Sequence, residues 1–321
     1  MLFGSDVLCI GSVTLDTFLK VERSLAKIKL GDKVLVSSLE KHSGGGATNA
    51  AVALTKFGLK ARILTKLGRD HDGEFIQKEL RQHKVENICL HHSHRCTDSA
   101  SIIDYSRDKD RIIYVHKGAS EDLKESDFKV ADLKSKWLYL ATLTGKSWKT
   151  AERIAHLAWE KHLPILFNPS LYLAQKGKTY LKPVLGVSFI LVLNREEALA
   201  LLGKKKGQPQ KLLRALQKLG PEIVIITDGP RRLYARHSQE IFSLQPPQVR
   251  IVHTAGAGDA FTAAFLGAYI KNYSFEDCLR LGQANACSVI QAKGVKHKLL
   301  TEKEAWNVIS KYKIKVRKER R

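Results

Sequence analysis

The segment best suited to chemistry is Thr254-Ala255-Gly256-Ala257-Gly258-Asp259, which directly precedes a predicted helix over Gly258 to Lys271. Gly256 and Gly258 permit backbone conformations that other residues resist, so successive N–H groups can converge on one point. Because this point lies at a helix N-terminus, it favours an anion such as a phosphate. Asp259 is then placed to accept a proton from an alcohol that attacks this phosphate. In the structural alternative, Asp259 only caps the helix and the glycines only turn the chain.

Two earlier segments offer groups for binding hydroxyls. Gly44-Gly45-Gly46-Ala47-Thr48-Asn49 is a glycine turn into a second helix, where the backbone can approach a ligand closely and Asn49 can bridge hydroxyls. Asp16 follows the first predicted strand, and its carboxylate can accept two hydrogen bonds from vicinal hydroxyls. A polyol needs paired acceptors of this kind.

A further segment, Asn194-Arg195-Glu196-Glu197, follows a predicted strand. Glu197 lies one helical turn beyond Asn194, so both side chains could face a hydrated Mg²⁺ through its waters. The same spacing is also that of a helix cap.

A second candidate metal site is formed by His92, His94 and Cys96, which could face one side of a strand at metal-ligand spacing. No distant fourth ligand is evident, so the favoured interpretation is a polar connection into the lid.

These segments sit between strand-like and helix-like runs that alternate along the chain. This rhythm predicts an α/β fold, a mostly parallel sheet with helices on both faces, and ligands at the carboxyl ends of its strands. The predicted strands are Val7–Val13, Arg62–Leu67, Trp137–Ala141, Ile165–Asn168, Phe189–Leu193 and Ile223–Thr227. The predicted helices are Ala47–Phe57, Glu74–His83, Thr150–Lys161, Glu196–Leu202, Pro209–Leu219, Gly258–Lys271, Phe275–Gln291 and Glu302–Lys311.

Two β-rich segments, residues 17–38 and 99–115, interrupt the alternation. Together they could form a small sheet that projects from the main one, and a lid over the site is expected from them. No repeat or low-complexity linker divides the chain, so residues 1–321 are expected to form a single domain with a lid.

Composition narrows the classes of function. The 321 residues carry a formal net charge of +22, which attracts anions such as nucleotides, sugar phosphates or nucleic acid. No apolar stretch is long enough for a membrane span, and the N-terminus lacks a secretory pattern, so a cytoplasmic protein is expected. Five cysteines without a C-x-x-C pair indicate reduced thiols rather than a disulfide framework.

The last eleven residues, 311–321, form a basic tail with seven cations and one anion. We expect a solvated, frayed terminus, because the tail follows no nucleic-acid module and has little aromatic content. The alternative is an arm that contacts RNA.

Taken together, these motifs resemble the ribokinase (PfkB) family of carbohydrate and nucleoside kinases. Its two glycine motifs match Gly44–Asn49 and Thr254–Asp259 in the right order, and the resemblance runs from about Val7 to Ala292. It implies a ribokinase-like fold, ATP as phosphoryl donor and a Mg²⁺ requirement.

The resemblance also implies roles for single residues. Asp259 would be the catalytic base, and Gly256, Ala257 and Gly258 the anion hole. Asp16, Gly44, Gly45 and Asn49 would hold the sugar, Asn194 and Glu197 would position Mg²⁺, Thr227 and Gly229 would contact ATP phosphates, and Asn285 would lie near the adenine.

Two residues depart from the family pattern and bear on the expected monovalent cation and acceptor. His253 stands where the family usually has an acidic residue that helps to bind a monovalent cation, so weak or absent activation by potassium is predicted. Gly46 stands where some kinases of phosphorylated sugars carry lysine, which favours an unphosphorylated acceptor.

The function expected from the sequence is therefore transfer of the γ-phosphoryl group of ATP to a primary hydroxyl of an unphosphorylated sugar, with ribose-like sugars favoured. A nucleoside is the alternative acceptor, since Phe18 in the lid could stack a base or equally pack the lid against the body. Lid strands with free edges make a homodimer plausible. The alternative from another class is a nucleic-acid-binding protein on an inactive kinase scaffold, which the intact Asp259, Asn194 and Glu197 argue against.

Overall fold

The main sheet of the computed structural model has ten strands within the residues described, which are 4–108, 110–292 and 294–319. Their order is β14-β13-β12-β11-β10-β9-β8-β1-β4-β5. The strands from β11 to β5 are parallel to one another, and β12, β13 and β14 are antiparallel. The bounds are β1 Val7–Ile10, β4 Ala61–Gly68, β5 Glu86–Ser93, β8 Trp137–Leu140, β9 Ile165–Phe167, β10 Ile190–Asn194, β11 Ile223–Thr227, β12 Leu233–His237, β13 Glu240–Leu244 and β14 Val316–Glu319.

Helices cover both faces of this sheet because its central strands are apolar on both sides. In β1, Val7 and Cys9 pack into one core while Leu8 and Ile10 pack into the other. The first core lies under α1 Gly46–Lys56, α2 His71–Gln82, α8 Ala257–Ile270, α9 Phe275–Val289 and α10 Glu302–Tyr312. The second lies under α3 Ser147–Glu160, α4 Leu171–Ala174, α5 Gly177–Leu185, α6 Arg195–Leu201 and α7 Pro209–Gln217.

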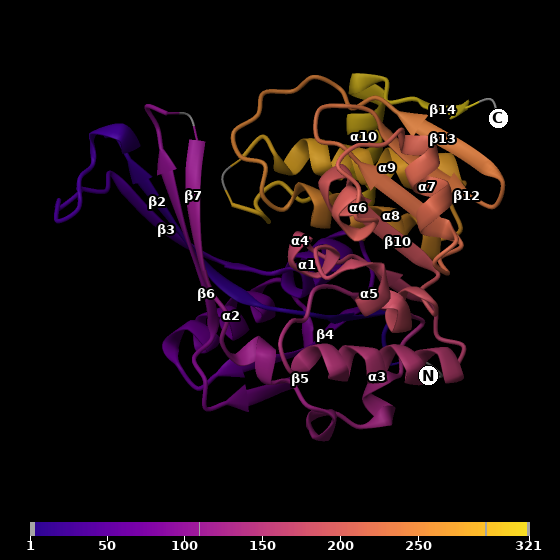
Figure 1. Cartoon of the computed structure of the whole chain (residues 1–321), viewed down its shortest axis with the longest axis horizontal. Helices are drawn as coiled ribbons and strands as arrows, with labels where there is room; N and C mark the ends of the chain where they lie inside the picture. The colour runs from indigo at the N-terminus through magenta and orange to yellow at the C-terminus, as the bar shows by residue number, and fades with distance from the viewer. Residues whose placement is uncertain (1–3, 109, 293, 320–321) are drawn as a thin grey trace.

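A second, four-stranded sheet with the order β3-β2-β6-β7 projects from the main body, at the left of Figure 1. We call it the lid. Its strands are β2 Thr14–Val21, β3 Ser38–Gly44, β6 Asp98–Tyr105 and β7 Asp110–His116. The lid strands extend beyond the predicted segments 17–38 and 99–115, so Asp16 and Gly44 are themselves lid residues. Lys109, in the connection between β6 and β7, lies outside the described residues.

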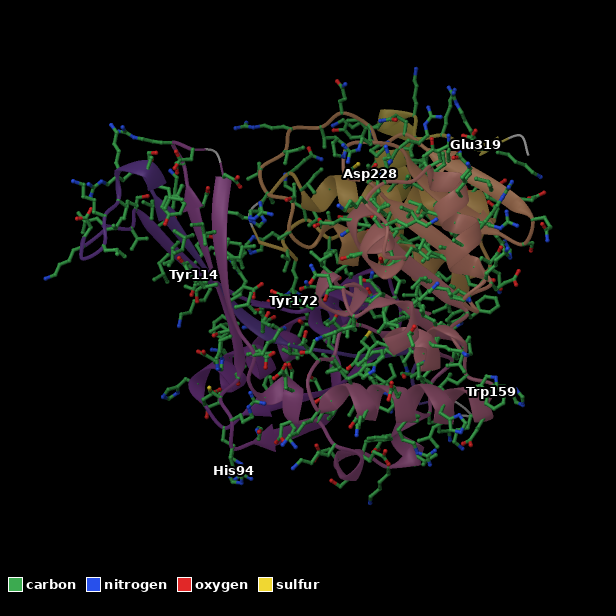
Figure 2. The ribbon with its side chains drawn as sticks, viewed as in Figure 1. His94, Tyr114, Trp159, Tyr172, Asp228 and Glu319 are labelled. Atoms are coloured by element: carbon green, nitrogen blue, oxygen red, sulfur yellow. The ribbon has the colours of Figure 1, made fainter. Side chains whose placement is uncertain are left out.

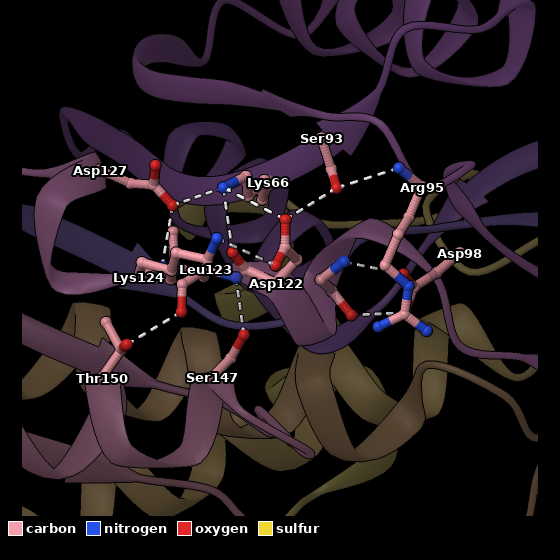
Figure 3. Close-up of polar contacts among 11 residues, drawn as sticks. Lys66, Ser93, Arg95, Asp98, Asp122, Leu123, Lys124, Asp127, Ser147 and Thr150 are labelled. Atoms are coloured by element: carbon pink, nitrogen blue, oxygen red, sulfur yellow. Dashed lines mark hydrogen bonds and ion pairs between the residues drawn. The ribbon is translucent and has the colours of Figure 1, made fainter.

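A polar network anchors the chain where it returns from the lid to the main sheet (Figure 3). The buried Lys66 of β4 donates to Asp127 Oδ2 at 2.7 Å and to the carbonyl of Asp122 at 2.9 Å. The N–H of Leu123 donates to Ser147 Oγ at 2.7 Å, and Thr150 donates to the carbonyl of Leu123 at 2.8 Å. This network fixes the root of the lid against β4 and α3.

The fold class predicted from the sequence is confirmed. Each predicted strand and helix is present, with ends within three residues of the predicted ones. Helix α2 begins earlier than predicted because Asp70 caps it, accepting from the N–H of Gly73 at 2.9 Å. The short strands β12, β13 and β14, the strand β5 and the helices α4 and α5 were not predicted.

The expectation of a frayed C-terminal tail is wrong for residues 311–319. Helix α10 continues to Tyr312, Ile314 is 4 % exposed, and β14 pairs with β13 at the edge of the main sheet. Residues 320 and 321 lie outside the described part. Within that part, no helix combines the length and hydropathy needed to cross a bilayer.

Candidate active site

A cleft of about 290 Å³ opens at the carboxyl ends of β10 and β11, beside the N-termini of α1 and α8. Parallel α/β sheets bind ligands at this end. Among the predicted site residues, the cleft is lined by Asn194, Glu197, Thr227, Gly256, Gly258 and Asp259. Segments that lie far apart in the sequence therefore meet in one cavity.

The start of α8 forms the centre of the cleft. Gly256 is the N-cap of this helix with a left-handed backbone (φ +77°), and a Cβ there would lie 2.7 Å from Val295 Cβ. Gly258 is different, because a Cβ there would meet no atom within 4 Å. The space in front of Gly258 is open, as an anion hole requires. Asp259 follows in the first helical turn, where its carboxylate borders the same space.

The two glycine motifs meet through one hydrogen bond. Asn49 Nδ2 in α1 donates to Asp259 Oδ2 at 2.7 Å, which links residues 210 positions apart. Gly45, the N-cap of α1, has φ +89°, and a Cβ there would overlap the backbone of Ser12. The glycine turn therefore lets α1 begin close to the end of β1, which brings Asn49 to Asp259.

Asp16 lies against the same turn. Thr14 donates to Asp16 Oδ1 at 2.7 Å, and a Cβ on Gly44 would overlap the carboxylate of Asp16. A side chain at Gly46 would also be obstructed, since its Cβ would lie 2.9 Å from that of Ala141. The turn is thus packed on one side by Asp16 and on the other by the end of β8.

Burial raises the pKa of three carboxyl groups of the site. The pKa of Asp259 is raised to about 6 by desolvation, against the hydrogen bond from Asn49 and the charge of Lys296, which lower it. Burial raises the pKa of Glu197 to about 7, and the neighbouring Asp259 adds to this shift. The pKa of Asp16 is also raised by burial, while Thr14 and Lys296 act in the opposite direction. Three desolvated carboxylates near one cleft would be stabilised by a bound cation or by the hydrogen-bond donors of a bound ligand.

Lys296 is a site residue that the sequence analysis missed. Its side chain is buried, and its Nζ bonds the carbonyl and hydroxyl of Ser43 and lies 3.3 Å from Glu79 Oε1. Glu79 Oε2 in turn accepts from the N–H of Ser43 at 2.8 Å. This pair holds Ser43, the residue before the glycine turn. Nothing in the sequence separates Lys296 from the exposed Lys298 two positions away.

Lys117 is a second cation at the cleft that the sequence analysis did not identify. It lines the cavity, lies 3.8 Å from the buried Asp98 and sits 5.9 Å from the ring of Tyr172. Tyr172 belongs to α4 of the main body and lies near the centre of the view in Figure 2.

Asn194 and Glu197 form the helix cap that was the structural alternative. Each accepts at 2.8 Å from the backbone N–H of the other, at the start of α6. Both still line the cleft. Within the described residues no group of three or more His, Cys, Asp or Glu side chains could enclose a metal. The half-buried carboxylate of Glu197 at the cleft nevertheless suits Mg²⁺, which commonly keeps waters and binds one or two carboxylates plus phosphates.

The remaining predicted residues lie at different distances from the cleft. Thr227 lines it, and Gly229 (φ +56°) turns the chain with open space around it. Asn285 does not belong to the lining. It is fully buried in α9, and its Oδ1 accepts from the N–H of Leu300 at 3.2 Å. The structure therefore does not bring Asn285 to the cleft.

The lid touches the body beside the start of α8. Arg111 of β7 donates to Thr254 Oγ1 at 3.3 Å, and the ring of Phe18 lies 5.3 Å from that of His253 in an edge contact. The Nδ1 atom of His253 accepts from the N–H of Ala255 at 3.2 Å. Burial and the neighbouring Arg111 lower the pKa of His253, which favours the neutral ring.

The residues considered for another metal site are elsewhere. His92, His94 and Cys96 are exposed near the end of β5, and Figure 2 shows His94 at the rim of the molecule opposite the C-terminal strands.

Comparison with known proteins gives one consistent family. Residues 5–302 match the model of the pfkB family carbohydrate kinases. The chain is 25 % identical over 312 residues to a nucleoside kinase of Methanocaldococcus jannaschii, covering 96 % of this chain and 98 % of that one. It is also 25 % identical over 308 residues to a ribokinase of Bacillus subtilis, covering 95 % and 99 %.

Solved structures show the same fold. The crystal structure of the M. jannaschii nucleoside kinase superposes with a TM-score of 0.82 at 22 % identity, covering 96 % of this chain and 99 % of that one. The structure of Arabidopsis thaliana ribokinase complexed with ribose and ATP also gives a TM-score of 0.82, at 21 % identity, with 95 % and 98 % covered.

Proposed function

Because the chain belongs to the pfkB family of carbohydrate kinases, we propose that it transfers the γ-phosphoryl group of ATP to a primary hydroxyl of an unphosphorylated, ribose-like sugar. The observation that supports this proposal is the bond from Asn49 to Asp259, which joins the carboxylate in the first turn of α8 to the segment expected to bind hydroxyls. A phosphate and an alcohol can therefore meet within reach of one carboxylate.

In this mechanism Asp259 acts as general base. Its pKa of about 6 leaves the carboxylate ionised near neutral pH and able to accept the hydroxyl proton. The acceptor oxygen forms a bond to the γ-phosphorus while the bond to the ADP oxygen breaks. The N–H groups of Gly256, Ala257 and Gly258 stabilise the charge that develops on the phosphoryl oxygens.

The donor would occupy the other side of the cleft. Thr227 lines the cavity there, and Gly229 leaves the backbone accessible to phosphates. Asn194 and Glu197 would hold Mg²⁺ through its waters, and the ion when bound neutralises phosphate charge. Lys117, which also lines the cleft, would add a cation. In the cytoplasm, where the sequence leads us to expect the protein, ATP would be available as this donor.

Because His253 stands in place of an acidic residue, we expect no strong requirement for a monovalent cation.

The acceptor would lie against Asp16 and Asn49, over the backbone of Gly44 and Gly45. The obstruction at Gly46 by Ala141 supports an unphosphorylated acceptor, because a lysine for a sugar phosphate would not fit there without rearrangement.

A nucleoside is the second candidate acceptor, as in the M. jannaschii relative named a nucleoside kinase. The position of Phe18 favours the sugar, because the ring packs between His42 and His253, with centroids 5.8 and 5.3 Å away. In this position it joins the lid to the body instead of presenting a free face to a base.

The test is an ADP-release screen over pentoses, hexoses, phosphosugars and nucleosides, with the Asp259→Asn variant as background. We expect pentoses to give the highest kcat/KM. A preference for nucleosides would select the second candidate. No release above the variant with any acceptor would refute the proposal.

We also propose that the protein forms a homodimer through the lid. Strand β7 is an edge of the lid sheet, and Ile113, Tyr114 and Val115 on it are 48, 60 and 41 % exposed. Sedimentation that shows only monomer at assay concentration would reject this arrangement.

A further inference from the structure

A cavity of about 360 Å³ lies between α2, β3 and the loop over residues 294–297. None of its lining residues lines the catalytic cleft, so the two cavities are separate. Its lining residues are Lys41, His42, Phe75, Lys78, Glu79, Gln82, His83, Gly294, Val295, Lys296 and His297. The volume suits a small metabolite.

The charge of this cavity is strongly unbalanced. Three lysines line it against one carboxylate, that of Glu79. Glu79 is already engaged, because it pairs with Lys296 and accepts from Ser43. Lys41 and Lys78 make no ion pair among the described residues. A concave surface with one sign of charge concentrates ions of the other sign.

Histidines also line the cavity. His42, His83 and His297 lie around the cavity, and the rings of His42 and His297 are 4.8 Å apart. The pKa of His83 is lowered by burial and next by the charge of Lys296, so the unfilled cavity already resists a further positive charge. A bound anion would relieve this repulsion.

We propose that this cavity binds a small, soluble anion that carries phosphate groups. Lysine ammonium groups bind phosphate as point charges, which matches the lining of this cavity by Lys41 and Lys78.

The cavity is mechanically connected to the acceptor segment. Lys296 and Glu79 hold Ser43 from the cavity side, and the next residue, Gly44, packs against Asp16. An anion that draws Lys296 away from Ser43 would shift the glycine turn and change the KM for the acceptor. This coupling, unlike the binding itself, rests on the proposed function.

The test uses inorganic pyrophosphate as probe and isothermal titration calorimetry as readout, without divalent cations. The full-length protein is titrated directly, because an ATP analogue would itself carry phosphate groups to this cavity. We expect the wild type to bind one pyrophosphate that K41Q/K78Q binds at least tenfold more weakly. The control K204Q/K206Q removes two exposed lysines at another surface hollow and should bind within twofold of the wild type.

Different results would contradict the site, its coupling to the acceptor segment and the proposed function. No binding to the wild type, or equal weakening in both double variants, would overturn the site. Thermal unfolding of each variant without pyrophosphate checks that the substitutions leave the fold intact. A competing single-stranded RNA that displaces pyrophosphate at lower concentration than a nucleoside diphosphate does would also overturn the assignment to a small molecule. Binding without any change in acceptor KM would overturn the coupling alone, whereas absence of kinase activity would count against the proposed function and not against the site.

Discussion

At Asp259, burial and hydrogen bonding act in opposite directions on the charge of the carboxylate. Desolvation raises its pKa, while Asn49 and Lys296 favour the ionised form. The balance leaves a base that is ionised near neutral pH and only partly hydrated. The neighbours of the carboxylate, and not its position in the motif alone, therefore determine its reactivity.

Replacing this base should remove turnover while sparing the donor site. For Asp259→Asn we expect kcat to fall by ~10²- to 10⁴-fold, because a positioned general base contributes about that factor, with ATP binding within a few-fold of the wild type. Steady-state kinetics and nucleotide titration measure the two. The control is Asp277→Asn, a carboxylate in the first turn of α9 that pairs with Arg280 away from the cleft. Near-normal turnover in Asp259→Asn would contradict the mechanism.

The charge of Lys296 should be visible in the pH profile. In the wild type, kcat/KM should rise with pH as Asp259 ionises around pH 6 and then level off. Lys296 lowers the pKa of Asp259, so Lys296→Met should raise that pKa and move the acid limb to higher pH. Lys298→Met, which removes an exposed lysine nearby, should leave the limb in place. An unmoved limb in Lys296→Met would show that its charge does not reach the base.

At the scale of elements, the glycine turn joins β3 of the lid to α1 of the body. Its residues belong to two parts of the fold, so the geometry of the proposed acceptor site depends on how the lid root meets the main sheet. The network around Lys66 and Asp127 holds that root from the other side (Figure 3).

A single methyl group in this turn tests the arrangement. A Cβ on Gly44 would overlap the carboxylate of Asp16, so Gly44→Ala should displace one of them and raise the acceptor KM at least tenfold, with a smaller effect on the KM for ATP. Gly186→Ala, at the end of α5 where the backbone is already helical, should change neither constant. Equal KM values for wild type and Gly44→Ala would mean that Asp16 does not contact the acceptor.

The sequence predicted the elements whose pattern is local. Buried strands such as β11 are continuous apolar runs, and the helices carry an apolar face or an identifiable start. Strand β14, with the sequence Val-Arg-Lys-Glu, has no such pattern and exists because β13 offers it an edge. Lys296 and Lys117 were missed because tertiary contacts decide which lysines lie beside the cleft. Asn285 matched a motif but folds inward to Leu300.

At the scale of the whole molecule, the +22 charge and the basic C-terminal segment raise the question of whether the protein binds nucleic acid. The structure gives that segment another role, since Ile314 is buried and β14 completes the sheet edge. Its exposed cations, such as Lys315 and Arg317, are those of a solvated edge strand that resists pairing with other chains.

Removing the segment should therefore cost stability. A chain that ends at Lys313 loses β14 and the burial of Ile314, which alone is worth about 2 kcal/mol, so its Tm should fall by several degrees in calorimetry. The charge variant K315Q/R317Q keeps the strand and should keep the Tm. If instead that variant lost a strong, salt-dependent affinity for RNA while the truncated chain unfolded at the wild-type temperature, the RNA-contacting arm would be the better interpretation.

At Gly258, the residue that suits helix stability differs from the residue that suits the proposed reaction. Gly258 lies in the first turn of α8 with open space where a side chain would go, so alanine would fit and would lose less backbone entropy on folding. On the proposed mechanism, a methyl group there would nonetheless occupy the room that the transferred phosphate needs. A design procedure that optimised the folded chain alone would then choose a residue that obstructs the reaction.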